Sequence, residues 1–389
     1  GSAKLIMTNS ADRVNVGGTF ENYVDSWTYD SDLQAGVMNV KGDFVCRDDD
    51  GFSTGGTHKV ILNGTGVQKV QIAGGGKGFN ELDIQNDKVV FVADTNMKGF
   101  KANHDITLNV SQGKTLQISG TLDLNGHTLY APGNLTLTGN GVNVKGGSIV
   151  VDGNLNLSCD VNLGGGKLQV KGNLIQSSHT LTVAGGTVDV SRDYRMEHEN
   201  VDSTGNVSYS DGSAKLIMTN SADRVNVGGT FENYVDSWTY DSDLQAGVMN
   251  VKGDFVCRDD DGFSTGGTHK VILNGTGVQK VQIAGGGKGF NELDIQNDKV
   301  VFVADTNMKG FKANHDITLN VSQGKTLQIS GTLDLNGHTL YAPGNLTLTG
   351  NGVNVKGGSI VVDGNLNLSC DVNLGGGKLQ VKGNLIQSS

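Results

Sequence analysis

Proline, aromatic residues, long apolar runs and excess positive charge are all scarce in this sequence. There are 2 prolines in 389 residues, and Phe, Trp and Tyr together make up 6%. No apolar run approaches the length of a membrane-spanning helix, so membrane insertion is not expected. The formal net charge of -10 argues against nucleic acid and anionic membranes as partners, because both require a basic surface.

Glycine, in contrast, is abundant, and the sequence repeats itself. The chain has 59 glycines, which together with persistent aliphatic residues favours turn-rich β structure over disorder. Residues 212–389 are identical to residues 1–178. The predicted domains are therefore a repeat unit at 1–211 and a second, incomplete copy at 212–389. We expect them to form one continuous rod within a longer array.

A shorter pattern runs from Leu116 to Tyr194 and returns every 19 to 20 residues. Each pass holds three pairs of residues spaced by two, nearly all of them apolar, and in most pairs a polar residue separates the two members. A period of two predicts a strand with one buried face. Three short strands per pass, repeated in register, are typical of a coiled parallel sheet. We predict an all-β fold, a parallel β-solenoid with lateral loops, and a right-handed coil from the general chirality of parallel crossovers.

Equivalent residues of successive passes, which we call rungs, are expected to stack along the coil. One rung alone cannot bury enough apolar surface to fold, so its stability must come from its neighbours. Narrow rungs have room mostly for Val, Leu and Ile inside. Asparagines in one corner column can form ladders along the axis. The predicted columns are Leu135, Leu155 and Leu174 inside, and Asn134, Asn154 and Asn173 at the corner.

The cysteines are two per copy, Cys46 and Cys159 with their repeats Cys257 and Cys370. Cys46 falls in an inward column and is expected to be buried. Cys159 follows a strand at a corner and is expected to be more exposed. The two lie several rungs apart, too far for a disulfide. Free thiols are therefore predicted, with an intermolecular bridge through Cys159 as the alternative.

Acidic segments interrupt the short period at residues 21–36, 47–51 and 197–206. The first contains Tyr23, Trp27 and Tyr29 beside carboxylates, a combination suited to stacking on sugars. These aromatic residues could instead pack down over the edge of the solenoid, which is the interpretation that we favour.

Candidate ligand sites are few. Asp48, Asp49 and Asp50 could attract calcium, but they lack the alternating spacing of an EF-hand loop, so a solvated loop is favoured and no cofactor is predicted. The glycine runs at 74–76 and 164–166 lack the lysine and hydroxyl of a phosphate-binding loop. The histidines show no metal-ligand spacing and are expected at the surface; they are His58, His104, His127, His179 and His198.

Catalysis is also not expected. Parallel β-helices include polysaccharide lyases and glycosidases, whose sites need carboxylates clustered on one face of consecutive rungs. Outward positions such as Thr136, Asn156 and Gln169 are mostly neutral.

The motif V-x-G-[ND]-[LFY] carries a resemblance to known proteins. It occurs at 151–155, 170–174 and 40–44, and at 190–194 with Arg192 in place of glycine. It resembles tandem modules of secreted Gram-positive surface proteins, as does the run at 57–66. The rung length resembles the stalk of filamentous haemagglutinins. The resemblance implies an extracellular, cell-surface location and a fibre or stalk, and it carries no catalytic residues.

The sequence therefore predicts a bacterial structural protein, a stiff filament of identical units. Its main partner is expected to be itself, through continuation of the array or end-to-end stacking. An adhesin that binds cell-surface polysaccharide, another glycan or a host protein through its loops is the alternative. A polysaccharide-degrading enzyme is the third hypothesis.

Overall fold

The computed structural model divides the chain into two compact units, Gly1–Ile175 (unit 1) and Gln176–Ser389 (unit 2), which we describe separately. The described residues are 3–23, 29–47, 52–73, 78–98, 101–112, 114, 116–119, 121–177, 179–196, 199–201, 203–204, 207–209, 214–235, 240–258, 263, 265–283 and 289–388.

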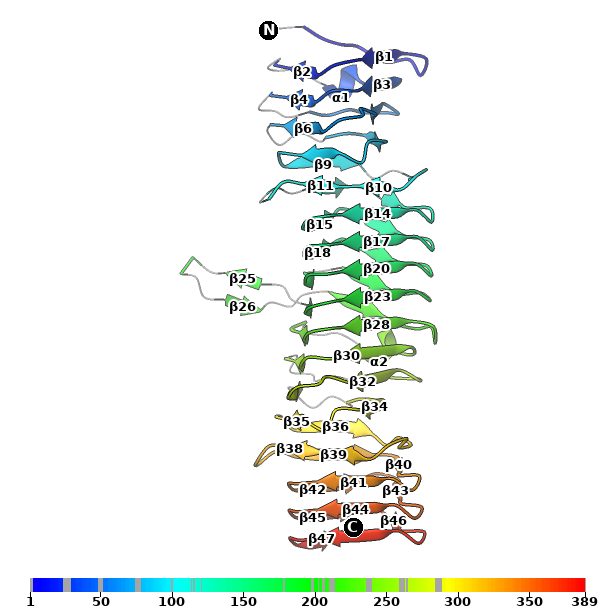
Figure 1. The fold of residues 1–389 in the computed structure, drawn as a ribbon, viewed down its shortest axis with the longest axis vertical. Coiled ribbons are helices and arrows are strands. Elements are labelled where there is room, and N and C mark those ends of the chain that lie inside the picture. Colours follow the sequence, from blue (N-terminus) through cyan, green and yellow to red (C-terminus); the bar gives the residue numbers. More distant parts are fainter. Residues whose placement is uncertain are drawn as a thin grey trace. The chain divides into compact units, whose positions relative to one another are not determined.

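Unit 1 is a stack of short parallel strands (Figure 1). Its N-terminal half contains one helical turn, α1 (Tyr29–Asp32), and the strands β1 (Arg13–Val16), β2 (Phe20–Asn22), β3 (Val37–Val40), β4 (Phe44–Cys46), β5 (Lys59–Leu62), β6 (Gln68–Ile72), β7 (Glu81–Ile84), β8 (Val89–Phe91) and β9 (Thr95–Lys98). Its C-terminal half contains β10 (Ile106–Thr107), β11 (Asn109–Val110), β12 (Leu116–Ser119), β13 (Thr121–Asp123), β14 (Thr128–Ala131), β15 (Leu135–Thr138), β16 (Gly141–Asn143), β17 (Ser148–Val151), β18 (Leu155–Ser158), β19 (Val161–Asn162), β20 (Lys167–Val170) and β21 (Leu174–Gln176, which crosses the unit boundary).

Unit 2 has the same construction, with one helical turn, α2 (Tyr240–Asp243). Its first strands are β22 (Thr180–Thr182), β23 (Thr187–Val190), β24 (Tyr194–Met196), β25 (Glu199–Val201), β26 (Val207–Tyr209), β27 (Lys215–Ile217), β28 (Arg224–Val227), β29 (Phe231–Asn233), β30 (Val248–Val251), β31 (Phe255–Cys257), β32 (Lys270–Leu273), β33 (Gln279–Ile283), β34 (Glu292–Ile295) and β35 (Val300–Phe302). The remaining strands are β36 (Thr306–Lys309), β37 (Ile317–Thr318), β38 (Asn320–Val321), β39 (Leu327–Ser330), β40 (Thr332–Asp334), β41 (Thr339–Ala342), β42 (Leu346–Thr349), β43 (Gly352–Asn354), β44 (Ser359–Val362), β45 (Leu366–Ser369), β46 (Val372–Asn373), β47 (Lys378–Val381) and β48 (Leu385–Gln387).

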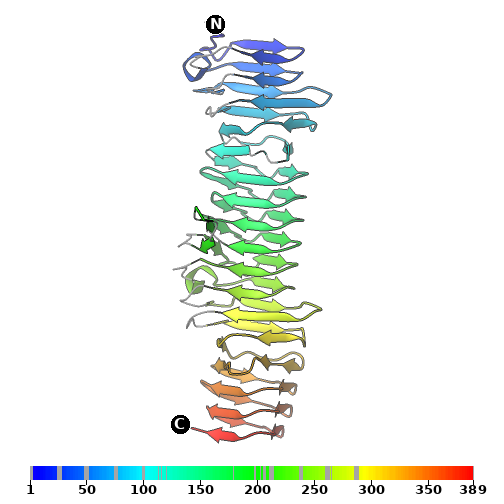
Figure 2. The same ribbon diagram turned by 90° about the vertical axis from the view of Figure 1, so that its left-hand side faces the viewer.

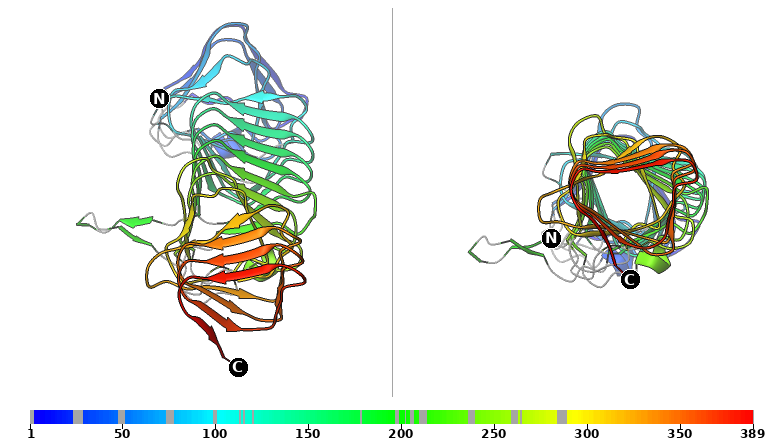
Figure 3. Two further views of the ribbon diagram at one scale, coloured as in Figure 1. Left: turned by 60° about the horizontal axis from the view of Figure 1, so that its bottom comes forward. Right: turned by 90° about the horizontal axis from the view of Figure 1, so that it is seen from below.

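The predicted fold class is confirmed. In unit 1, β15 pairs with β18 in parallel, so that Leu135 lies opposite Leu155. The corner residues Asn134 and Asn154 are 20 positions apart, and Asn154 and Asn173 are 19 apart. Figure 2 shows the strands of each unit lying one above another, and the view along the stack in Figure 3 shows the strands of unit 2 following one closed outline. Each unit is a parallel β-solenoid with three short strands per regular rung.

The interior of unit 1 contains more aromatic side chains than we expected. Phe44, Phe52 and Phe79 are fully buried. Their ring centroids lie 4.9–5.2 Å apart in tilted or edge-to-face contacts. The expectation that the interior has room mostly for Val, Leu and Ile is therefore wrong for the irregular half of the copy, where longer rungs leave room for rings.

Two side chains that we expected at the surface are buried. Cys159 is 2% exposed and His58 is 0% exposed. In both cases the alternation of buried and less buried side chains continues past the end of the strand. Cys159 is buried and the next residue, Asp160, is exposed. His58 precedes its strand by one residue and points inward, as Val60 does. Burial raises the pKa of the Cys159 thiol to about 12, with a smaller contribution from the Asp160 carboxylate. Cys46 is buried as predicted, and none of the four cysteines, all of which are described, is in a disulfide bond.

The compact units do not coincide with the sequence copies. The first copy ends at residue 211, whereas the boundary between the units falls after Ile175. Unit 2 therefore contains the last part of the first copy together with the whole second copy, including the point where one follows the other. A single rod through the whole chain stays a prediction.

Candidate functional site: the junction between the two copies

The junction between the copies is built like a step within one copy. Three strands at the end of the first copy pair in parallel with three strands at the start of the second. Leu181 lies opposite Leu216, Val188 opposite Val225, and Tyr194 opposite Phe231. Parallel pairing and the alternation of buried side chains therefore continue across the junction.

A hairpin occupies the chain between the two sides of the junction. Asp189 and Asn226, which lie on paired strands, are 37 residues apart, compared with 19 to 20 in the regular block. Part of the additional chain forms the antiparallel pair β25–β26, which extends to one side of the stacked strands of unit 2 (Figure 1). Because the hairpin extends to the side of the stack, the next rung, formed by β27, β28 and β29, pairs directly with β22, β23 and β24.

The junction buries apolar residues that are partly exposed in the first copy. Phe231 is fully buried, and its ring centroid lies 5.5 Å from that of Tyr194 in an edge-to-face contact. Val225 is also fully buried. Their counterparts Phe20 and Val14, in an identical sequence, are half-buried. The last rung of the first copy thus packs against the first rung of the second copy and buries its apolar side chains.

The buried side chain of Gln176 forms hydrogen bonds next to the apolar residues of the junction. Its Nε2 donates to the carbonyl oxygens of His179, at 2.8 Å, and Lys215, at 2.9 Å. The hydroxyl of Tyr194 donates to its Oε1 at 2.6 Å. Both side chains are at most 1% exposed, and burial raises the pKa of the Tyr194 hydroxyl. Gln176 therefore connects the two copies, since Lys215 belongs to the second.

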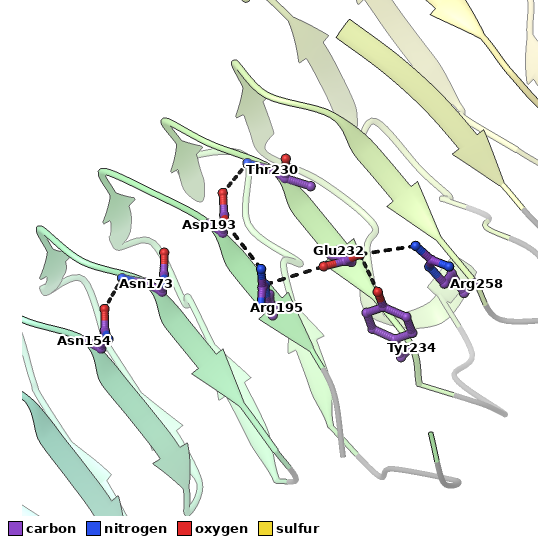
Figure 4. A network of polar contacts seen from close by, with 8 residues as sticks. All are labelled: Asn154, Asn173, Asp193, Arg195, Thr230, Glu232, Tyr234 and Arg258. Atoms are coloured by element: carbon purple, nitrogen blue, oxygen red, sulfur yellow. Dashed lines mark hydrogen bonds and ion pairs between the residues drawn. The ribbon is translucent and has the colours of Figure 1, made fainter. Parts of the chain in front are cut away.

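Glu232 is the centre of a charged group on the outer surface of the junction (Figure 4). Its carboxylate lies 3.5 Å from Nε of Arg195 and 3.6 Å from Nη2 of Arg258, and it accepts a hydrogen bond from the hydroxyl of Tyr234. The Arg258 guanidinium lies 5.1 Å from the centroid of the Tyr234 ring. Partly exposed ion pairs of this length contribute little stability, roughly 0–1 kcal/mol each. Only the Arg195–Glu232 pair joins the two copies, so it favours one register of the copies rather than holding the copies together.

The predicted asparagine column forms a ladder in unit 1, but not through side-chain amide pairs. Oδ1 of Asn134 accepts the backbone N–H of Asn154 at 2.8 Å, and Oδ1 of Asn154 accepts that of Asn173 at 2.8 Å. Leu135, Leu155 and Leu174, which follow them, are at most 2% exposed. In unit 2, Asp193 plays the same part by accepting the N–H of Thr230 at 2.9 Å (Figure 4).

The loop residues considered for glycan binding are only partly described. Tyr23 is 61% exposed, and the Arg47 guanidinium lies 5.4 Å from its ring centroid. Its ring therefore does not pack down over the edge of the solenoid. Tyr29 begins α1. Trp27 and the aspartates 48–50 lie outside the described residues, as does His198.

The part of the chain that the structure describes offers neither a metal-binding cluster nor a membrane-spanning helix. Within it, no group of three or more His, Cys, Asp or Glu side chains could hold a metal ion. Among the same residues, no helix is long and apolar enough to cross a bilayer.

The sequence contained a signal for the junction that we did not use. In the last rung of the first copy, Tyr194 replaces the leucine of the preceding rungs, Arg192 replaces a glycine and Asp193 replaces an asparagine. These departures from the pattern coincide with the contacts to the second copy. Comparisons with known protein families, with curated proteins and with solved structures found no match.

Proposed function

We propose that the protein is a structural fibre or stalk that lengthens by adding identical solenoid units. One observation carries the proposal: strands of the second copy continue the parallel pairing of the first, residue for residue. A copy therefore needs no new kind of interface to follow another. In this proposal the chain works outside the cell and without catalysis, as the resemblance of its V-x-G-[ND]-[LFY] motifs to surface-protein modules implies.

The proposal predicts how length depends on the number of copies. The full chain should be compared by electron microscopy with a chain extended by one further 211-residue unit. We expect unbranched particles of constant width, longer by one fixed increment and unbent at each junction. Particles that instead broaden, or that bend freely where copies meet, would contradict the proposal.

An adhesin is the second candidate, because Tyr23 presents an exposed ring beside Arg47. Flat aromatic faces at a surface suit the apolar faces of sugars. Glycan arrays with the full chain and with the Trp27→Ala and Trp238→Ala variants separate the two candidates. Binding that these substitutions abolish would favour adhesion through the loops, and no binding would favour the scaffold alone.

A further inference from the structure

A polar groove lies on the outer face of the junction, apart from the loops considered above. Its volume is about 550 Å³, and it crosses four successive rungs of unit 2. The polar side chains that line it are Asp189, Ser191, Asn226, Asn250, Lys252 and Asn274. We propose that this groove binds a neutral, linear oligosaccharide, which goes beyond the scaffold function.

The groove contains a ladder of fixed hydrogen-bonding groups. Nδ2 of Asn226 donates to Oδ1 of Asp189 at 2.7 Å, and Nδ2 of Asn250 donates to Oδ1 of Asn226 at 2.7 Å. These bonds set the orientation of both amides. Each amide nitrogen carries a second N–H, and each carboxylate or amide oxygen can accept more than one bond. The ladder thus has ordered donors and acceptors in addition to those that it uses internally.

Asn274, at the end of the groove, has an acceptor without a partner. Its Oδ1 is buried and accepts no hydrogen bond from the described residues. A buried polar atom without a partner is costly, roughly 1–3 kcal/mol. The same oxygen of its repeat, Asn63, is in the same state, and neither atom is accessible from outside, so this acceptor does not distinguish the junction and is not assigned to the ligand.

The charges and spacing of the groove define the class of ligand. Asp189 and Lys252 contribute one charge of each sign, so the lining favours neither an anion nor a cation. Hydroxyl groups both donate and accept, and they match a lining of amides, a hydroxyl and isolated charges. The rungs repeat at about 4.8 Å, close to the length of one sugar residue in a linear chain. Successive sugars can therefore meet equivalent side chains on successive rungs.

The complete set of side chains that line the groove is present only where one copy follows another. The first copy repeats the ladder, with Asn39 donating to Asn15 at 2.8 Å. Asp189 and Ser191, however, belong to the last rung of a copy, whereas Asn226 and Asn250 belong to the first rungs of the next. The structure thus assigns one groove to each junction, and the first copy provides a matched control.

The test uses the full chain and a panel of linear hexasaccharides: cellohexaose, xylohexaose, mannohexaose and chitohexaose. Calorimetry or saturation-transfer NMR should detect binding of at least one of them. We expect Asn250→Ala and Lys252→Ala each to weaken it at least tenfold, and Asn39→Ala and Lys41→Ala to leave it unchanged. Lys252 is exposed, so its substitution should not impair folding, which circular dichroism checks.

Two outcomes would overturn the inference. In one, no hexasaccharide binds. In the other, the substitutions in the two copies have equal effects, which would mean that the junction contributes nothing. Neither outcome bears on the scaffold, since particle length in the microscope is measured without any ligand.

Discussion

Two buried histidines are expected to make the stability of the protein depend on pH. His58 and its repeat His269 are fully buried, and neither ring nitrogen of either residue has a hydrogen-bond partner among the described residues. Burial lowers the pKa of each to about 4. Between that pH and the unfolded value near 6.5, the unfolded chain binds the proton and the folded chain does not.

Stability should therefore fall as the pH drops from about 6.5 to about 4, by roughly 3 kcal/mol for each histidine. Below that range these groups should add no further change. Urea unfolding at pH 7 and pH 4.5 measures the difference. In the double variant His58→Leu, His269→Leu, this part of the pH dependence should disappear. An unchanged pH profile in the variant would show that other groups are responsible.

Gln176 offers a comparison between identical sequences. Gln176→Leu leaves the buried Tyr194 hydroxyl and two partly buried carbonyl oxygens without this partner. We expect a loss of at least about 2 kcal/mol in the free energy of unfolding. The repeat of this residue, Gln387, is exposed, so Gln387→Leu should change stability by less than about 0.5 kcal/mol. Equal losses in denaturant titrations would argue against a specific role at the junction.

At the scale of the rung, glycines at the corners permit close stacking. A β-carbon on Gly153 would lie 2.7 Å from the backbone nitrogen of Asn134 on the neighbouring rung. Backbone atoms cannot rotate away as a side chain can, so the corner of one rung would have to move from the next. The hydrogen bond from Asn154 to Asn134 lies at this same corner. A larger distance between the two rungs would therefore also weaken the asparagine ladder.

We therefore predict that Gly153→Ala lowers the free energy of unfolding by about 2 kcal/mol or more. Gly66→Ala is the control, because no heavy atom lies within 4 Å of a β-carbon placed there. That substitution should be neutral or stabilising by up to about 1 kcal/mol. Thermal melting of the two variants provides the comparison. A Gly153→Ala protein as stable as the parent would mean that the rungs can separate at little cost.

At the scale of the whole molecule, the position of a rung in the stack determines how well its side chains are buried and how readily it opens locally. Residues 167–177 and 378–388 have the same sequence. Leu168 and Leu174 are fully buried, whereas the repeat of Leu174, Leu385, is 52% exposed. Regions with few buried contacts open more easily than the interior. The two segments should therefore differ in local stability although no residue differs.

Hydrogen exchange followed by mass spectrometry can detect this difference in one measurement. Peptides from the two segments have the same mass, so they appear as one signal. We expect that signal to split into two populations of equal size, one exchanging at least a hundredfold more slowly. A single population would mean that both segments are equally protected, and that burial does not govern their stability.

The regular block was predictable from sequence because its signals are local. Alternation of apolar and polar residues identifies the inward side of each strand, and the return of Leu135 as Leu155 indicates which strands pair. The errors at Cys159 and His58 came from ending that alternation one residue too early. The burial of Phe52 and Phe79 was not predicted, because the width of an irregular rung depends on its loops, which have no period.

The sequence by itself determined the period, the inward columns and therefore the parallel β-solenoid of each unit. It could not determine the junction. Gln176 and Gln387, like Phe20 and Phe231, have identical local sequences but different burial. The reason is physical: burial in a stack comes from the rungs above and below, so only the tertiary structure decides which copy of a side chain is covered and what it contacts.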